Sequence, residues 1–132
     1  MYLDYLNMNS SLYRQEILDH ARNPHNFGKL DKADAFLHEA NLSCGDEITL
    51  YLKYGKKNRQ KIVNQATFEG RGCILCLAGA SMLTEYINSK PVEKLKKMKE
   101  RNALAMFGHE LTPSRTKCAL LSFEALNKLV NA

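Results

Sequence analysis

Long apolar runs are missing from this chain of 132 residues. No stretch reaches the ~18 consecutive apolar residues that a membrane-spanning helix requires, so we expect no membrane segment. The first residues include Asp4 and Asn7 and do not follow the pattern of a secretory signal peptide. Because neither a membrane-spanning run nor a signal-peptide pattern is found, we expect a cytoplasmic protein.

The motifs of several large enzyme classes are also missing. The chain has no Walker loop, no GxGxxG and no Ser/His/Asp order, which argues against nucleotide binding and triad hydrolysis. It has no internal repeat, linker or low-complexity stretch. With 45% hydrophobic and 25% charged residues, the composition is that of an ordinary globular protein. We expect one domain over residues 1–132, with residues 1–9 as a flexible arm.

The net charge of +5 would suit nucleic-acid binding. However, there is no aromatic motif on a predicted strand, and the basic residues lie mainly in two surface-like segments. One of them, over residues 94–101, is typical of a solvated helix face. We therefore expect acidic protein partners rather than nucleic acid.

A clear alternation of apolar and polar residues organises the first half of the chain. Ile48, Leu50 and Leu52 alternate with polar neighbours, which predicts a strand over 47–54. A glycine-rich turn at 69–72 then leads to a nearly continuous apolar helix at 74–87. Strands therefore precede this turn and helices follow it. The other expected elements are helices at 10–21, 91–101 and 117–130, strands at 36–41 and 61–68, a turn at 55–60 and a loop at 108–114.

Cysteine is scarce, with four residues in the chain. In the cytoplasm these are expected to be thiols or metal ligands rather than disulfides. Cys44 precedes the predicted strand 47–54, while Cys73 and Cys118 are each expected to begin a helix. Boundaries of this kind are where a rigid scaffold usually carries functional side chains.

The residues around these cysteines indicate a shared metal site. Cys44 and Asp46 are two apart, so in an extended segment they point the same way and could hold one ion together. Cys73 and Cys118 would complete a set of three thiolates and one carboxylate, which suits tetrahedral zinc or iron in a cluster. Because the carboxylate is the weaker ligand for a soft metal, such a site should release its load easily.

Nearby groups are expected to favour the thiolate form. The N-terminus of the helix would act on Cys73, whose basic neighbour is Arg71. Arg115 and Lys117 would act in the same way on Cys118. The alternative for these basic residues is that they steer an incoming persulfide. For each cysteine the alternative is a buried, inert thiol.

The remaining cysteine and the histidines admit other interpretations. Cys76 lies three residues after Cys73 and could be a core thiol, a further ligand or the partner in a CxxC redox pair. The apolar residues between the two cysteines favour a core or supporting thiol. The histidines show no zinc spacing with one another, and each is interpreted as a hydrogen-bonded structural residue; they are His20, His25, His38 and His109. Among them, His109 is the candidate for a spare ligand.

Four motifs together carry a family resemblance. They are His20-Ala-Arg-Asn-Pro-His-Asn-Phe-Gly28, Ser43-Cys-Gly-Asp46, Phe68-Glu-Gly-Arg-Gly-Cys73 followed by Ala80-Ser-Met82, and Arg115-Thr-Lys-Cys-Ala-Leu-Leu121. Through them the chain resembles the IscU/SufU family of iron–sulfur cluster assembly scaffolds, which includes the N-terminal module of NifU. The resemblance runs from about residue 13 to residue 129.

The resemblance implies an α+β fold, with a three-stranded antiparallel sheet covered by helices. It implies that Cys44, Asp46, Cys73 and Cys118 hold Zn²⁺, Fe²⁺ or a transient [2Fe–2S] cluster. Sulfur would come from a cysteine desulfurase as persulfide, with Cys118 as the first acceptor. The finished cluster would pass to apo iron–sulfur proteins.

Departures from the family motifs bear on the subtype. The IscU branch has histidine before its last cysteine and a Leu-Pro-Pro-Val-Lys chaperone motif upstream. Here Lys117 and Leu111-Thr-Pro-Ser-Arg115 stand at those places, which argues against recognition by an Hsp70-type chaperone. Arg-x-Lys-Cys resembles SufU, but the interval from Cys73 to Cys118 is short for SufU's usual insertion.

We interpret the chain as a non-enzymatic scaffold that assembles [2Fe–2S] clusters and hands them on. The alternative is a SufU-type zinc-dependent sulfurtransferase that relays persulfide from the desulfurase. A thiol–disulfide oxidoreductase using Cys73 and Cys76 is a third interpretation.

Overall fold

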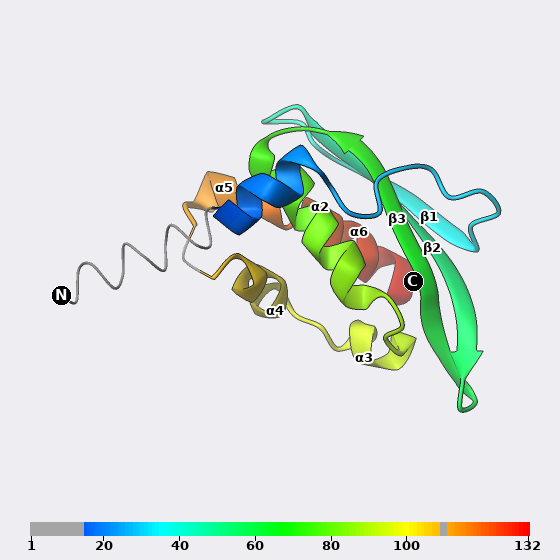
Figure 1. Cartoon of the computed structure of the whole chain (residues 1–132). Helices are drawn as coiled ribbons and strands as arrows, with labels where there is room; N and C mark the ends of the chain where they lie inside the picture. The colour runs from blue at the N-terminus through cyan, green and yellow to red at the C-terminus, as the bar shows by residue number, and fades with distance from the viewer. Residues whose placement is uncertain (1–14, 109–110) are drawn as a thin grey trace.

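A computed structural model of the chain describes residues 15–108 and 111–132. Within these residues a three-stranded antiparallel sheet, in the order β1-β2-β3, is followed by helices (Figure 1). The helices lie against one face of the sheet, with α6 (Leu121–Val130) against β1 and β2 and α2 (Ile74–Ile87) against β3. The predicted α+β class is confirmed. No helix in the described part of the chain is both long and apolar enough to cross a membrane.

The three strands occur at the three places predicted, although alternation of side chains was the basis only for the second. They are β1 (Ala35–Asn41), β2 (Asp46–Lys57) and β3 (Gln60–Arg71). The predicted inward residues Ile48, Leu50 and Leu52 are fully buried, since alternate side chains of a strand face the helices.

The turns at both ends of β3 are shorter than the predicted ones. The strands continue through the basic segment expected to be a turn, and only Asn58 and Arg59 connect them, both with positive φ (51° and 68°). Such a two-residue turn matches the twist of the paired strands and allows the ladder to extend to the tip. The expected glycine-rich turn at 69–72 is also mostly strand, because Glu69 and Gly70 pair with Thr49 and Ile48.

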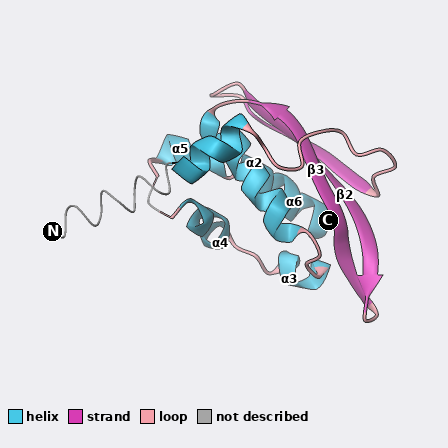
Figure 2. Ribbon diagram, viewed as in Figure 1, coloured by secondary structure: helices cyan, strands magenta, loops and turns pink. Residues whose placement is uncertain are grey.

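The helix α2 has the predicted bounds and packs on most of its sides. Most of its residues from Cys76 to Ile87 are buried, as expected of a nearly continuous apolar helix. It lies between β3 and the other helices in the centre of the molecule (Figure 2). The buried part of α2 therefore fixes the position of its first turn and of Cys73, the residue that precedes it.

The last third of the chain differs from the prediction. The expected helix at 91–101 is two short helices, α3 (Val92–Lys96) and α4 (Glu100–Leu104), followed by the 3₁₀ turn η1 (Ala105–Phe107). The chain breaks at Lys97–Lys99, where Met98 is buried and the Asn102 side chain accepts a 2.8 Å hydrogen bond from the Lys99 N–H. Local capping and burial thus start a new helix.

The expected helix at 117–130 is also two helices, α5 (Pro113–Ala119) and α6, with a break at Leu120. The N-terminus of α5 is capped by the Thr112 side chain, with proline at the first position, which is a favoured helix start. Part of the expected loop at 108–114 is therefore helical. Cys118 lies in the last turn of α5 instead of beginning a helix.

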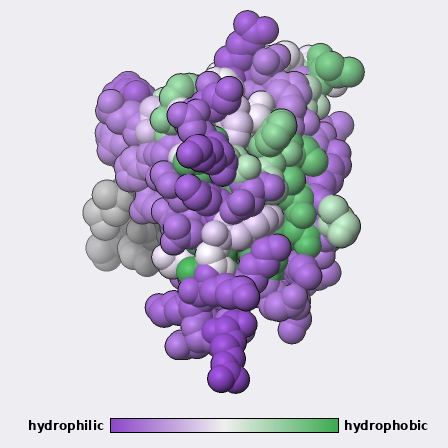
Figure 3. Space-filling view, turned by 90° about the vertical axis from the view of Figure 1, so that its right-hand side faces the viewer, coloured by the Kyte–Doolittle hydropathy of each residue, from purple (hydrophilic) through white to green (hydrophobic). Residues whose placement is uncertain are grey.

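The N-terminal part of the described chain lies beside the outer edge of β3. Residues 15–22 are helical, while the predicted start of this helix and the arm at 1–9 lie outside the described residues. Gly28 N–H donates to the Phe68 carbonyl at 2.8 Å, and Phe68 N–H donates to the Asn26 carbonyl at 3.0 Å. These bonds extend the sheet edge and attach the segment to β3. The surface on the side of the sheet is mostly hydrophilic (Figure 3).

Candidate functional site

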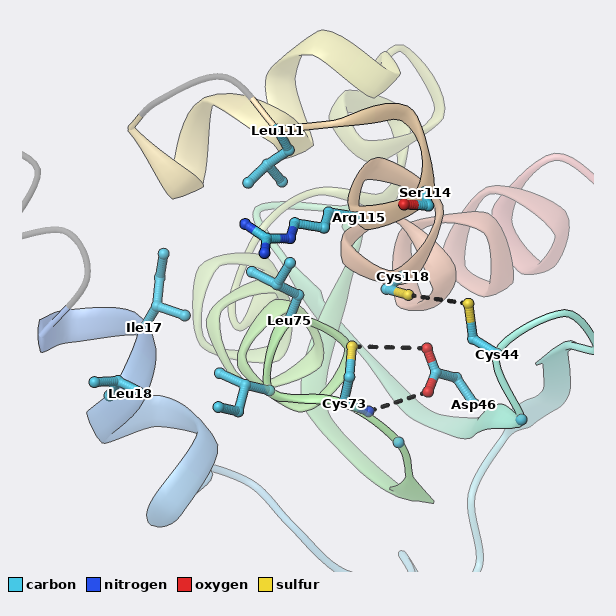
Figure 4. Close-up of a pocket in the computed structure, with 13 residues that line it drawn as sticks. Ile17, Leu18, Cys44, Asp46, Cys73, Leu75, Leu111, Ser114, Arg115 and Cys118 are labelled. Carbon is cyan, nitrogen blue, oxygen red and sulfur yellow. Dashed lines mark hydrogen bonds between the residues drawn. The ribbon is translucent and has the colours of Figure 1, made fainter.

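Four functional side chains singled out from the sequence lie around one open pocket (Figure 4). Cys44 comes from the β1–β2 turn and Asp46 begins β2, while Cys73 precedes α2 and Cys118 belongs to α5. The pocket has a volume of about 770 Å³. Three of the four ligand atoms, those of Cys44, Asp46 and Cys118, lie within 4.8 Å of one another.

The β1–β2 turn brings Cys44 to the pocket. The N–H groups of Cys44 and Gly45 both donate to the Asn41 carbonyl, at 3.2 and 2.9 Å. Gly45 has a φ of +73°, a left-handed conformation that glycine adopts without strain. This tight turn places Cys44 just above the start of β2, beside Asp46.

Asp46 lies near Cys44 and Cys118 and also bonds to Cys73. Its side chain is nearly fully buried, and its Oδ1 accepts a 3.0 Å hydrogen bond from the Cys73 N–H. Cys73 is the N-cap residue of α2 but has no side-chain cap of its own, so Asp46 satisfies the first amide of this helix terminus. The Cys73 thiol also donates to Asp46 Oδ2 over 3.8 Å.

Gly72 allows this close approach. A Cβ atom at Gly72 would lie 2.5 Å from Asp46 Oδ1 and 2.8 Å from its Cγ, which is well inside van der Waals contact. Any residue larger than glycine at position 72 would therefore clash with the Asp46 side chain.

Two of the three sulfur atoms, those of Cys44 and Cys118, are spaced as a metal site requires. Cys118 Sγ lies 3.7 Å from Cys44 Sγ, and both thiols are free. Two thiolates on a tetrahedral zinc ion, with Zn–S bonds of ~2.3 Å, would have their sulfur atoms about 3.8 Å apart. Cys44, Asp46 and Cys118 thus offer a donor set that fits zinc or iron. Cys73 does not belong to this close group and contacts it through Asp46. The role of all four residues as one ligand set stays a prediction.

The protonation of Cys118 differs from the expectation. Burial raises the pKa of the Cys118 thiol well above its ordinary value, and hydrogen bonds with Asp46, Cys44 and Cys73 raise it further. The expected net lowering of the Cys118 pKa is therefore wrong, since desolvation of the charged form dominates. A metal ion would have to displace the proton of Cys118.

Cys76 lies in the core. It is 1% exposed, and burial raises its pKa to about 12, with smaller contributions from Asp46 and Cys73. It does not line the pocket. A thiol that is inaccessible and protonated is a poor redox nucleophile, so the structure favours the core interpretation over the CxxC pair.

The apolar wall of the pocket was not foreseen from the sequence. Ile17 and Leu18 of the helical segment 15–22 line it together with Leu75 and Leu111 (Figure 4). The sequence shows the apolar positions of that segment, but it does not show that they pack beside the cysteine pocket. The candidate spare ligand His109 lies outside the described residues.

Comparisons with known proteins agree with this geometry. The NifU-like N terminal domain matches residues 12–132. The chain is 35% identical to the iron–sulfur cluster assembly scaffold protein IscU of Thermotoga maritima, over 89% of this chain and 91% of that protein. It is 36% identical to the zinc-dependent sulfurtransferase SufU of Bacillus subtilis, over 89% and 88% of the two chains.

Among solved structures, the fold matches a proposed iron–sulfur cluster assembly scaffold of the SUF system from Fervidobacterium islandicum. The TM-score is 0.67 at 25% identity, and the match covers 87% of this chain and 93% of that one. The three-stranded sheet with its helices is therefore shared with this group of proteins.

Proposed function

This chain belongs to the NifU-like N-terminal domain family, and we propose that it is a scaffold on which [2Fe–2S] clusters are assembled. The observation that carries the proposal is the convergence of Cys44, Asp46 and Cys118 within 4.8 Å, with Cys73 bonded to the same carboxylate. Thiolates and a carboxylate of this arrangement suit an iron–sulfur cargo.

The exposure of the site suits a cargo that must leave. Cys44 and Cys73 are exposed, whereas Asp46 and Cys118 are buried. A recipient protein could therefore reach the cluster from the side of the two exposed thiols. Leu42 and Ile74, which flank them in the sequence, are 94% and 50% exposed and would give a partner an apolar contact beside the pocket.

Cys118 is proposed as the acceptor of sulfur from a cysteine desulfurase. Its thiolate would attack the outer sulfur of the desulfurase persulfide. The outer sulfur would then be bonded to Cys118, and the desulfurase cysteine would leave as thiolate. Because its pKa is raised by burial, we expect the metal-free Cys118 to be slow in this step.

The scaffold function is tested by anaerobic reconstitution. The protein is incubated with Fe²⁺, cysteine, a cysteine desulfurase and a thiol reductant such as dithiothreitol, and then with an apo-ferredoxin. Oxidation of two Fe²⁺ to Fe³⁺ supplies two of the four electrons that reduce the two persulfide sulfurs to sulfide, and the thiol reductant supplies the other two. We expect a visible cluster chromophore that is lost from the scaffold as the ferredoxin gains it. The matched controls are Cys44→Ala, which should form no stable cluster, and Cys76→Ala, which should still form it. A wild-type protein that gains no chromophore would refute the proposal.

A zinc-dependent sulfurtransferase is the second candidate. It is favoured by the 36% identity to SufU of Bacillus subtilis and by the spacing of Cys44 and Cys118, which is that of two ligands on one zinc ion. In this case the protein should retain one tight zinc ion and accelerate desulfurase turnover. Cys118→Ala should abolish that acceleration, and no cluster should pass to the ferredoxin.

A further inference from the structure

A second group of potential metal ligands lies away from the cysteine pocket. His20, His25 and Glu85 each offer one ligand atom, and these atoms lie within 4.8 Å of one another. We propose that they bind a divalent first-row transition-metal ion such as Zn²⁺ or Fe²⁺. Two imidazoles and one carboxylate form a donor set that these ions accept.

A buried hydroxyl holds the two histidines in place. Ser81 on α2 is completely buried. Its Oγ lies 2.7 Å from His20 Nδ1 and accepts a 2.8 Å hydrogen bond from the backbone N–H of His25. Polar partners of this kind fix the orientation of ligating imidazoles. Ser81 therefore orients the ring of His20 and the backbone of His25. The two rings lie 4.6 Å apart between centroids.

The third donor comes from the next turn of α2. Glu85 Oε2 is paired with Nδ1 of His25. Both side chains are about half exposed, at 55% and 56%, so an ion from solvent can reach them. Ligands on two separate segments would be joined by one ion.

The charge around the histidines also favours a cation. A hollow of about 460 Å³ beside them is lined by polar or charged residues, namely Gln15, Glu16, Asp19, His20, Asn23 and His25. Among the residues that the structure describes, its lining includes two carboxylates and no lysine or arginine. Clefts lined by one sign of charge concentrate ions of the opposite sign.

The site is distinct from the cysteine pocket but mechanically connected to it. Ser81 lies eight residues after Cys73 on α2, which corresponds to about 12 Å along a helix. The helical segment that carries His20 also carries Ile17 and Leu18, which line the cysteine pocket. An ion at the histidine site would therefore fix one wall of that pocket to α2.

Zinc binding to the full chain tests the inference. Isothermal titration with Zn²⁺ should show a class of sites that is weakened at least about tenfold in both His25→Ala and Glu85→Gln, since even partners of metal ligands usually contribute about 10- to 100-fold. The same Zn²⁺ should shift the ring resonances of His20 and His25 in nuclear magnetic resonance spectra. The matched control is His38→Ala, because His38 also faces a carboxylate, Glu47 at 3.8 Å, but belongs to no such group within residues 15–108 and 111–132.

Each outcome has a defined meaning. Since His25 and Glu85 are half exposed, both variants should fold, and their thermal unfolding without metal checks this. Zinc binding at the cysteine pocket should remain in both variants. A loss of binding at the cysteine pocket can therefore be distinguished from a loss at the histidine site. The inference is overturned if Zn²⁺ leaves the His20 and His25 resonances unchanged, or if both variants bind zinc with the affinities of the wild type.

Discussion

Replacing Asp46 separates two contributions of one carboxylate. Its Oδ1 accepts the 3.0 Å hydrogen bond from the Cys73 N–H, and the side chain is 3% exposed. Asp46→Ala therefore leaves this amide without its acceptor. A hydrogen bond to a charged group contributes about 1.5–3 kcal/mol, so we expect the free energy of unfolding of the metal-free protein to fall by about 2 kcal/mol. Asp46→Asn keeps an oxygen at this place and should lose about 1 kcal/mol or less.

The same variants test the role of the carboxylate in cluster release. Oxygen is a weaker ligand than thiolate for iron, so the bond to Asp46 should be the one that a recipient's thiolate displaces first. We expect Asp46→Ala to transfer its cluster to apo-ferredoxin more slowly than the wild type.

Urea denaturation measures the first effect, and circular dichroism of the cluster follows the second. If Asp46→Asn is destabilised as much as Asp46→Ala, the hydrogen-bond argument is wrong. An unchanged transfer rate in Asp46→Ala would contradict the argument about release.

Three further predictions concern the same pocket. Because burial raises the pKa of Cys118, zinc must displace its proton. The zinc affinity should therefore rise about tenfold per pH unit between about pH 6 and 8 for each proton released. Competition with a chromophoric chelator measures this affinity, and an affinity that does not change with pH would contradict the prediction. Gly72→Ala places a Cβ atom 2.5 Å from Asp46 Oδ1. The free energy of unfolding should therefore fall by about 1–3 kcal/mol, and zinc binding should weaken. Denaturation and zinc titration measure the two effects, and unchanged values in both would refute the steric role of Gly72. Cys76→Ala should keep the zinc stoichiometry of the wild type in metal analysis, and a lost zinc ion would make Cys76 a ligand.

The local pattern was sufficient to predict the sheet and the central helix. In β2 the alternation of Ile48, Leu50 and Leu52 reflects one buried face, and this information is contained in neighbouring residues. The bounds of α2 were predicted for the same reason, since its apolar run starts after a glycine and ends before Asn88.

The same kind of pattern failed in the last third of the chain. The apolar positions continue across Leu120, so one helix was expected. In the structure Leu120, with φ −93° and ψ 0°, ends α5 and caps the start of α6. The break at Lys97–Lys99 depends on the burial of Met98 and on the cap made by Asn102. Tertiary contacts of this kind override helix propensity, and they do not leave a periodic trace in the sequence.

The sequence by itself determined which chemical groups are available: three cysteines and one aspartate at element boundaries, in motifs typical of a cluster scaffold. Only the tertiary structure decided that Cys44, Asp46 and Cys118 lie within 4.8 Å of one another. The reason is that the packing of α2 on the sheet and of α5 on α2 sets distances between residues far apart in the chain. The tertiary structure also decided the protonation of Cys118, since Arg115 and Lys117 are visible in the sequence but desolvation by the whole fold is not. The meeting of His20 and His25 with Glu85 has the same origin, because Ser81 on α2 holds the two histidines across the gap in sequence.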